Sequence, residues 1–400
     1  MFGKKEKEMS DREILHCDLD NFFASVETFY RPELGKVPMA VCGSEEERHG
    51  IVLAKNQLAK QYGIKTAQAI WQAKQLCPSL VTVEPHYDRY VDFSRRARAI
   101  YDSYTDMVEP FGIDECWLDV TGSGLIFGSG EDIARQINRR IKEEIGITVS
   151  VGVSFNKCFS KLGSDLNKPD GVTVITRENF KDTVWGLPVQ SLLWVGKSTL
   201  ATLERMGIYT IGDICRTRLS ALEAVLGKNG KSLYANAMGM DSSPVLRESE
   251  MPPAKSIGRS VTGSADLKSD LEVFRVLLSL SEEVSEKLRS CSLLAGGIQI
   301  HIRDSMLVTV ERSIKLERPT RLAKELANEG FRLFKSNWQW HRQVRSIGIR
   351  ATRLECDSSD FQLQFDYDYA KALREERIEQ SVDSLRKRYG SQAVVRAALL

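Results

Sequence analysis

The sequence lacks the long apolar runs that a membrane protein needs. No run of about 18 consecutive apolar residues occurs, so no membrane-spanning helix is predicted. The first residues, MFGKKEKEMSDR, are charged and lack the apolar core of a secretion signal. We therefore expect no membrane partner, a cytoplasmic location, and a disordered lead-in over residues 1–9.

Cysteine motifs, phosphate-binding loops and charge of one sign are also scarce. The eight cysteines are scattered, without a C-x-x-C pair or a close cysteine–histidine group, which argues against zinc and favours reduced thiols in the cytosol. No Walker A motif is present, so a P-loop is not expected. The net charge is only +2, although residues 255–355 hold 18 Lys and Arg against 12 Asp and Glu. That local surplus indicates either a phosphate-facing surface or an ordinary solvated one.

The length of 400 residues predicts two to four domains. Up to residue 178, helical and strand-like segments alternate, which predicts a sheet covered by helices. From about residue 179, short helices with glycine turns follow, and residues 195–208, VGKSTLATLERMGI, are typical of a helix–turn–helix unit. Residues 244–256 contain three prolines and are expected to form a linker.

The C-terminal part is predicted to be an α+β domain followed by a charged tail. Residues 257–355 show two long helical segments, 269–289 and 320–336, among strands. Within residues 356–400, only 369–389 has a helical pattern. The apolar residues of that helix, which are expected to pack on the body or on a partner, are Leu373, Ile378, Val382 and Leu385.

An apolar strand near the N-terminus ends in two carboxylates. Residues 13–20 have a strand pattern that finishes with Asp18 and Asp20, and a helical pattern starting with Phe22 and Phe23 follows at once. Aspartate is a common helix-capping residue, so a cap on the next helix is the plain alternative for Asp20.

A second acidic pair, Asp114 and Glu115, lies between two apolar strand-like halves of residues 108–122. Adjacent side chains of a strand point to opposite faces, so both acids share one site only if the chain turns, which Gly112 permits. Carboxylates that converge repel one another unless cations separate them. Mg²⁺ prefers oxygen ligands, and two such ions can clamp a phosphoryl transfer. Asp18, Asp114 and Glu115 are therefore candidate metal ligands, a pattern that fits several enzyme classes.

Two lysines, Lys60 and Lys168, are candidate partners for a substrate that carries several phosphates. Lys60 lies in LAKNQLAKQYGIKT and Lys168 in NKPDG, and neither follows a P-loop pattern. A triphosphate needs such cations to offset its charge. The plain alternative for each lysine is an ordinary surface position.

Five segments together resemble the Y-family, lesion-bypass DNA polymerases of the polymerase IV (DinB) type. They are DLDNFFASVE, GIKTAQAIWQAK, PFGIDECWLDV, TVSVGVSFNKCFSKLGSDLNKPDGV and SIGRSVT, in that order, and the resemblance covers roughly residues 13–355. It implies a template-directed polymerase that adds deoxynucleotides to a primer 3′-hydroxyl by two-metal-ion nucleotidyl transfer. It also implies low fidelity, bypass of damaged templates, and no proofreading nuclease.

The resemblance implies an α+β multidomain fold arranged as a right hand, with a palm, small fingers, a helical thumb of the helix-hairpin-helix type and an α+β little finger. The thumb is expected to grip the DNA minor groove. The implied bounds are palm 10–21 and 86–178, fingers 22–85, thumb 179–245, linker 246–254, little finger 255–355 and tail 356–400.

The resemblance also assigns roles at the active site. Asp18, Asp114 and Glu115, with the backbone carbonyl of Leu19, match the ligands of two Mg²⁺ ions. Phe23 matches the steric gate, whose ring occupies the space that a ribonucleotide 2′-hydroxyl needs. The remaining nucleotide-binding candidates are Lys168, which matches a triphosphate lysine, Phe22, for which helix-to-sheet packing is the alternative, and Gln57 and Lys60, which stand where many relatives have tyrosine and arginine.

Primer–template DNA and deoxynucleoside triphosphates are the implied partners, and a monomer is expected. The DNA-binding candidates are Lys157 and Lys161, which are expected to face DNA or the palm surface, Gly196 at the thumb hairpin, and Ser256 and Arg259, with Arg259 expected on template phosphate. Residues 360–368, DFQLQFDYD, resemble a sliding-clamp peptide through Gln362, Leu363 and Phe365, although a solvated linker is the alternative.

Two other classes of protein remain open at this stage. A haloacid-dehalogenase-like phosphatase also begins with a strand that ends in D-x-D, but Phe22 stands where threonine or valine is usual, and no later acidic motif for its magnesium is evident. A non-catalytic DNA-binding scaffold is the second alternative, and the presence of all three acids argues against it.

Overall fold

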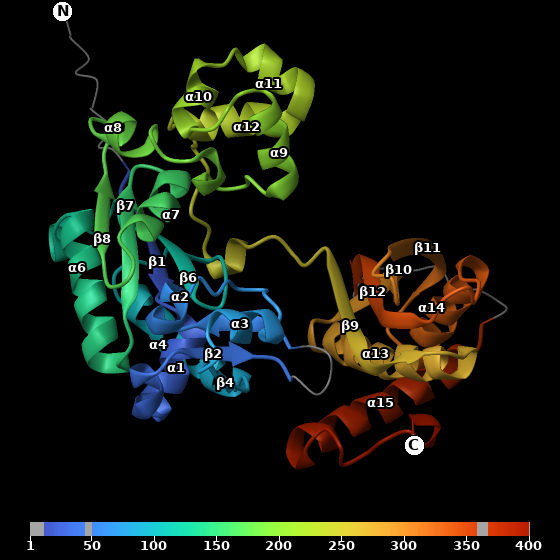
Figure 1. The fold of residues 1–400 in the computed structure, drawn as a ribbon. Coiled ribbons are helices and arrows are strands. Elements are labelled where there is room, and N and C mark those ends of the chain that lie inside the picture. The colour runs from blue at the N-terminus through green and yellow to red at the C-terminus, as the bar shows by residue number, and fades with distance from the viewer. Residues whose placement is uncertain (1–11, 45–49, 358–366, 400) are drawn as a thin grey trace, which may run out of the picture. The chain divides into compact units, whose positions relative to one another are not determined.

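The computed structural model describes residues 12–44, 50–357 and 367–399. The chain divides into two compact units, Met1–Gly43 with Gly50–Met251 and Ser44–His49 with Pro252–Leu400. Figure 1 shows the elements of each unit. No helix in the described part of the chain is long and apolar enough to cross a membrane.

A five-stranded sheet with β1 at its centre organises the first unit. Its order is β5-β6-β1-β7-β8, with β1 antiparallel to both neighbours and β7 parallel to β8. All six residues of β1 are buried, which fits a strand covered on both faces. The strands are β1 (Ile14–Leu19), β5 (Val108–Pro110), β6 (Glu115–Asp119), β7 (Val149–Ser154) and β8 (Val172–Ile175).

Helices cover the two faces of this sheet differently. On one face, Leu15, Cys17 and Leu19 join an apolar core with α4 (Tyr87–Asp102) and α6 (Gly130–Arg140).

The other face carries polar residues and receives α7 (Lys157–Leu166) at very short range. A Cβ added at Gly152 of β7 would lie 1.9 Å from the Ser160 carbonyl oxygen, so only glycine allows this approach. Since α7 lies so close to the sheet, its polar side chains reach the even-numbered residues of β1.

A small three-stranded sheet, β3-β2-β4, forms a second layer in the first unit together with three helices. Its strand β4 (Val81–Val83) was not predicted from the sequence. The other elements are α1 (Phe22–Tyr30), β2 (Met39–Cys42), β3 (Val52–Lys55), α2 (Gln57–Gln61) and α3 (Ile70–Leu76).

Short helices follow the five-stranded sheet and form their own apolar core with the start of α7. The predicted helix–turn–helix unit is present, but residues 195–208 hold only its first helix and its turn, and the second helix begins at Ile211. Gly207, with a φ of +75°, makes the turn between them. The helices are α8 (Phe180–Val184), α9 (Lys197–Arg205), α10 (Ile211–Arg216), α11 (Leu219–Leu226) and α12 (Lys228–Ala237).

The second unit is a four-stranded antiparallel sheet, β11-β10-β12-β9, packed on two long helices. The predicted α+β character and both helices are confirmed, whereas strand β9 was missed because none of its residues is buried and polar residues interrupt its apolar ones. The elements are β9 (Ser256–Leu267), α13 (Asp270–Ser290), β10 (Leu293–Asp304), β11 (Thr309–Thr320), α14 (Ala323–Asn337) and β12 (Val344–Cys356).

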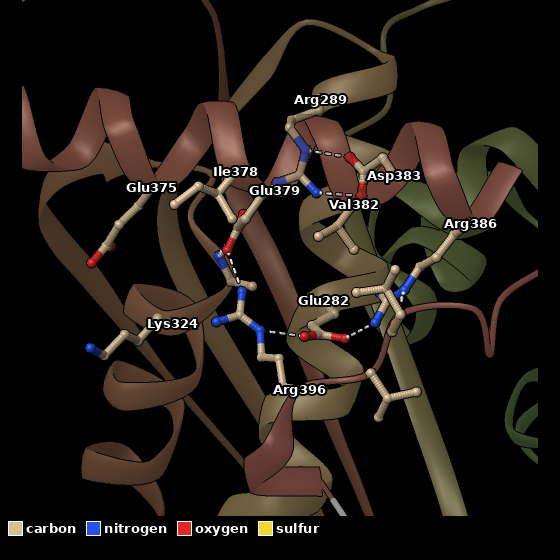
Figure 2. Close-up of a pocket in the computed structure, with 13 residues that line it drawn as sticks. Glu282, Arg289, Lys324, Glu375, Ile378, Glu379, Val382, Asp383, Arg386 and Arg396 are labelled. Atoms are coloured by element: carbon tan, nitrogen blue, oxygen red, sulfur yellow. Dashed lines mark hydrogen bonds and ion pairs between the residues drawn. The ribbon is translucent and has the colours of Figure 1, made fainter.

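The tail helix α15 (Tyr369–Tyr389) has the predicted bounds, but it packs in an unexpected way. Its apolar residues Leu373, Ile378 and Leu385 are exposed rather than packed. The helix instead contacts α13 and α14 through charged groups around a cavity of about 270 Å³ (Figure 2).

Glu379 is the centre of this charged contact and is only 7% exposed. Its carboxylate accepts hydrogen bonds from Arg289 at 2.6 Å, Arg396 at 2.7 Å and the Ala323 backbone N–H at 3.2 Å. Arg289 also donates to Asp383 at 2.7 Å. Because each buried charge has a partner of opposite sign, the network helps to hold α15 on the second unit, next to the half-buried Val382 that lines the same cavity.

We predict that Glu379→Ala destabilises the second unit by about 3–5 kcal/mol, because it removes the shared acceptor of Arg289, Arg396 and the Ala323 N–H and leaves Asp383 as the remaining partner of Arg289. Calorimetry of the full chain would show a lower unfolding temperature for one transition. Arg377→Ala, at an exposed position of the same helix, is the matched control and should change little. Equal unfolding temperatures for the two variants would contradict this account of α15.

Candidate active site

The predicted acids lie on two hydrogen-bonded strands at one end of the sheet. Asp18 of β1 stands directly opposite Glu115 of β6, which puts both side chains on the same sheet face. The Leu19 N–H donates to the Asp114 carbonyl at 3.1 Å. The Phe111 N–H donates to the Glu115 carbonyl at 2.9 Å, so the chain turns between these residues as expected near Gly112.

Two lysines reach the acids, one from helix α7 and one from the NKPDG loop that follows this helix. The Lys161 Nζ lies 2.9 Å from Asp18 Oδ2 and 3.2 Å from Glu115 Oε1. The Lys168 Nζ lies 2.6 Å from the same Asp18 oxygen. Asp165 binds both lysines, at 3.4 Å from Lys161 and 2.8 Å from Lys168. The result is an alternating cluster of three carboxylates and two ammonium groups.

The position of Lys161 corrects the expectation that it faces DNA or the palm surface. Its side chain is 14% exposed and points among the acids. Burial alone lowers the pKa of Lys161, but the carboxylates of Asp18, Asp165 and Glu115 outweigh burial and raise it. Lys161 is therefore a permanent positive charge inside the cluster, a role that spacing along the sequence did not indicate.

Among the described residues, Asp114 has no cation at contact distance, and it is electrostatically disfavoured as an anion. Burial first, and then the charges of Asp18 and Glu115, raise the pKa of Asp114 to about 6. The Glu115 Oε2 atom is buried without a hydrogen-bond partner. Within the described ranges, no three acidic, histidine or cysteine side chains stand in metal-binding geometry. Asp18, by contrast, is paired with both Lys161 and Lys168.

His16 is a further member of the site that sequence reasoning missed. It lies two residues before Asp18 on the same strand face, and its Nε2 is 3.4 Å from Glu115 Oε2. Its Nδ1 pairs with the Ser164 hydroxyl at 2.9 Å. Burial lowers the pKa of His16 to about 3, so the ring is neutral. Lys161, and not His16, therefore offsets the negative charge of Glu115. Its position on the same strand face, two residues from Asp18, was the available signal.

The capping alternative for Asp20 is wrong, because no side chain caps α1. Asp20 instead accepts hydrogen bonds from the Ser150 hydroxyl and the Asp170 backbone N–H, each at 2.8 Å. The second bond ties the NKPDG loop to β1. Since Lys168 lies in that loop, Asp20 helps to fix the lysine that contacts Asp18.

The two phenylalanines of α1 have different environments. Phe22 is 3% exposed and belongs to the main core. Phe23 is half-buried and stacks on Tyr90, with 4.1 Å between ring centroids and 10° between planes. Tyr87 meets Phe23 edge-on at 5.9 Å. Phe23 is therefore a half-buried ring held in place by two tyrosines, whereas Phe22 packs in the core, as the packing alternative for Phe22 predicted.

The lysines of the small sheet form a second positive group. Gln57 and Lys60 lie on α2, and Lys60 is exposed. Lys55, which sequence reasoning did not select, donates to the Thr66 hydroxyl at 3.3 Å. Burial and then the charge of Lys60 lower the pKa of Lys55, which shows that the two cations repel each other. An anion between them would relieve that repulsion.

The remaining DNA-binding candidates are not brought together at the acids. Lys157 lies 2.5 Å from Glu109 and 4.4 Å above the Trp117 ring, so its charge is already paired. Gly196 is the exposed N-cap of α9. In the second unit, Ser256 and Arg259 line a surface hollow of about 520 Å³ on the sheet. The clamp residues Gln362, Leu363 and Phe365 lie outside the described residues.

Three family models match the chain. Residues 17–165 match the impB/mucB/samB family, and residues 254–365 match the C-terminal domain of that family. Residues 191–241 match the DNA polymerase-iota thumb domain. Asp18, Asp114 and Glu115 thus lie within a matched segment, and each of the two units contains at least one match.

Curated relatives and a solved structure give the same assignment. DNA polymerase IV of Acetivibrio thermocellus is 48% identical over 389 residues, covering 97% of this chain and 98% of that protein. DNA polymerase IV 2 of Bacillus subtilis is 36% identical, covering 98% and 95%. The Y-family DNA polymerase chimera Dbh-Dpo4(243-245)-Dbh has a TM-score of 0.76 and 26% identity, covering 86% of this chain and 99% of that one. The chain therefore belongs to the Y-family DNA polymerases of the DNA polymerase IV (DinB) type and is a DNA-directed DNA polymerase of translesion synthesis with the right-hand fold of that family.

Proposed function

We propose that nucleotidyl transfer takes place at the acid cluster, with Asp18, Asp114, Glu115 and the Leu19 carbonyl as ligands of two Mg²⁺ ions. The observation that carries this proposal is the pairing of Asp18 with Glu115 across β1 and β6, with Asp114 at the adjoining turn. All of these donors are oxygens, the ligand type that Mg²⁺ prefers. The unpartnered Glu115 Oε2 and the disfavoured charge of Asp114 both support a cation site.

Bound divalent ions would activate the primer 3′-hydroxyl and stabilise the leaving pyrophosphate. Lys161 and Lys168 are proposed to offset the negative charge that the metal ions do not. Lys161 is inside the cluster, where it offsets two carboxylates. Lys168, which shares Asp18 with Lys161, is the residue that turns to the triphosphate when Asp18 engages a cation.

The triphosphate is proposed to be held by Lys168 together with Gln57 and Lys60 of α2. The mutual repulsion of Lys55 and Lys60 supports an anion at this position. Lysine supplies a point charge but lacks the bidentate fork of arginine, so triphosphate binding here depends on charge more than on geometry.

Phe23 is proposed to exclude ribonucleotides. Its ring is fixed by stacking on Tyr90 and by the edge of Tyr87, so it cannot yield to an added hydroxyl without losing those contacts. Phe22 is buried and packs helix α1, which carries Phe23, onto the core.

The arrangement of the elements supports the proposed domain bounds. Strands β1 and β5 to β8 fall within palm residues 10–21 and 86–178, and the small sheet falls within fingers 22–85. The division after Met251 lies in the linker proposed for 246–254. We also propose that Gly196, Ser256 and Arg259 contact DNA and that residues 360–368 dock on the sliding clamp. The protein is further proposed to be a monomer and to be located in the cytoplasm.

We predict that Asp114→Ala lowers primer extension by about three orders of magnitude or more, because the removed group acts as part of a unit. Binding of primer–template DNA should persist, since it depends mainly on phosphate contacts. Glu131→Ala, at a charged position on α6 away from the cluster, is the control. An Asp114→Ala enzyme with full activity would overturn the metal site, and a wild-type protein that binds DNA without extending primers would favour the scaffold alternative.

The stabilisation of the protein by Mg²⁺ should depend on pH. The folded-state pKa of Asp114 is raised to about 6 from its usual value, so without metal its ionisation destabilises the fold as pH rises from about 4 to above 6. Mg²⁺ binds the ionised form, so the Mg²⁺-induced rise in Tm should grow over that range. Asp114→Asn should remove the pH dependence of the Mg²⁺ effect, and an unchanged dependence in this variant would contradict the assignment.

We predict that Phe23→Ala lowers the preference for deoxyribonucleotides by about 100-fold, the scale on which a pocket rejects one added hydroxyl. Single-nucleotide insertion with dNTP and rNTP substrates measures this ratio. Phe29→Ala on the same helix, whose ring also packs on an aromatic neighbour, is the control. If both variants keep the wild-type ratio, Phe23 is a packing residue.

A further inference from the structure

Glu27 is a buried carboxylate on α1, the helix that also carries Phe23. It is the one charged residue of that helix, and it is 0% exposed. Moving a carboxylate out of water costs free energy unless hydrogen-bond donors surround it. An apolar residue would hold two packed helices together at a lower cost. The role of Glu27 therefore depends on its hydrogen bonds rather than on packing alone.

The groups that contact the Glu27 carboxylate come from the start of α4 and from the residue before this helix. The Tyr90 hydroxyl donates to Glu27 Oε1 at 2.7 Å, and the Arg89 Nη1 donates to Oε2 at 3.2 Å. The His86 Nδ1 lies 2.9 Å from Oε1. Because both oxygens are engaged, the carboxylate is held in one orientation and fixes the place of the Tyr90 hydroxyl.

Tyr90 connects Glu27 to Phe23. Its hydroxyl also accepts a hydrogen bond from the His86 backbone N–H at 3.1 Å, so the hydroxyl is held both as donor and as acceptor. Its ring stacks on Phe23, with 4.1 Å between centroids and 10° between planes. Phe23 and Glu27 are four residues apart and share one face of α1. One tyrosine thus contacts both residues, with Glu27 at its hydroxyl and Phe23 at its ring.

We propose that Glu27 is a positioning residue for sugar discrimination, which holds Tyr90 so that Tyr90 holds the ring of Phe23. The proposal rests on the proposed function, because it takes Phe23 as the residue that excludes ribonucleotides. Glu27 is buried and acts through Tyr90 rather than on the nucleotide itself.

A ring excludes a sugar hydroxyl only while it cannot move aside, and a displacement of about 1 Å is enough to change the geometry of a site. Tyr90 covers one face of the Phe23 ring, so Phe23 moves toward that side only if Tyr90 moves as well. The two hydrogen bonds of the Tyr90 hydroxyl oppose this movement. Residues of a site are held in place when their neighbours are themselves fixed by packing and hydrogen bonds. Glu27 thus limits the movement of Phe23 through Tyr90.

A positioning role and a purely structural role predict different kinetics. If Phe23 gains freedom, the enzyme accepts ribonucleotides better, so their kcat/KM rises. If a change only weakens the packing of α1 on α4, kcat/KM falls for ribonucleotides and deoxyribonucleotides alike. The readout is therefore the ratio of the two kcat/KM values, which is independent of the fraction of active protein.

The first test is Tyr90→Phe, which removes the hydroxyl and keeps the stacked ring. The preference for deoxyribonucleotides should fall about tenfold through faster ribonucleotide insertion, less than the roughly 100-fold fall expected for Phe23→Ala. Tyr101→Phe on the same helix is the matched control, because its buried hydroxyl has no hydrogen-bond partner in the described part of the chain. This control should keep the wild-type ratio.

Two variants of Glu27 test the hydrogen bond directly. Glu27→Gln keeps an oxygen that accepts from Tyr90, whereas Glu27→Leu has a similar size and removes both oxygens. Glu27→Gln should keep a ratio close to that of the wild type, and Glu27→Leu should lower it as Tyr90→Phe does. If Glu27→Leu does not fold, Tyr90→Phe still decides the outcome. A Glu27→Gln enzyme that loses as much selectivity as Tyr90→Phe would contradict the hydrogen bond as the means of positioning.

Combining Tyr90→Phe with Phe23→Ala separates this inference from the proposed function. The double variant should match Phe23→Ala alone, because Tyr90 acts only through that ring. If Phe23→Ala itself keeps the wild-type ratio, the proposed role of Phe23 fails and this inference fails with it. If Phe23→Ala lowers the ratio but Tyr90→Phe does not, or if the double variant loses further selectivity, this inference alone is overturned.

Discussion

The charge crowding at the end of β1 and β6 is the constraint on which the rest of the site depends. Asp18 and Glu115 face each other on one sheet face, and Asp114 adds a third carboxylate at the turn. Such a group is unstable without positive charge. Lys161 supplies that charge from α7, at 2.9 and 3.2 Å from the two paired acids. The ammonium group of Lys161 thus offsets the repulsion between the two paired carboxylates.

Lys161 reaches the acids because Gly152 of β7 has no side chain. Gly152 lets α7 approach β7 so closely that no Cβ fits between them. Asp20 then fixes the NKPDG loop through the Asp170 N–H, which brings Lys168 to the same aspartate. A structural glycine and a structural aspartate therefore position the two lysines, although neither takes part in the chemistry.

Local pattern predicted the parts of this site that are local, and failed for those that depend on packing. The strand before Asp18, the turn near Gly112 and the helix over 369–389 follow from short-range periodicity and turn residues. Lys161 was misassigned because 143 residues separate it from Asp18, and only the α7 contact joins them. Strand β9 was missed because an exposed edge strand needs no apolar alternation. The ion pairs of α15 were not predicted, because charged residues on a helix usually indicate a face that is exposed to solvent.

The strained Trp194 and the crowded acids are joined by one short segment of chain. The hairpin from Pro110 to Glu115 carries the acids at one end and Phe111 at the other, and Phe111 meets Trp194 from the α9 loop. The Phe111 N–H donates to the Glu115 carbonyl, so the residue that contacts Trp194 belongs to the same turn as the acids. The turn that carries the carboxylates and the contact of Trp194 are therefore held by one packed hairpin, a setting in which a backbone conformation unfavourable for tryptophan, with a φ of +74°, can persist.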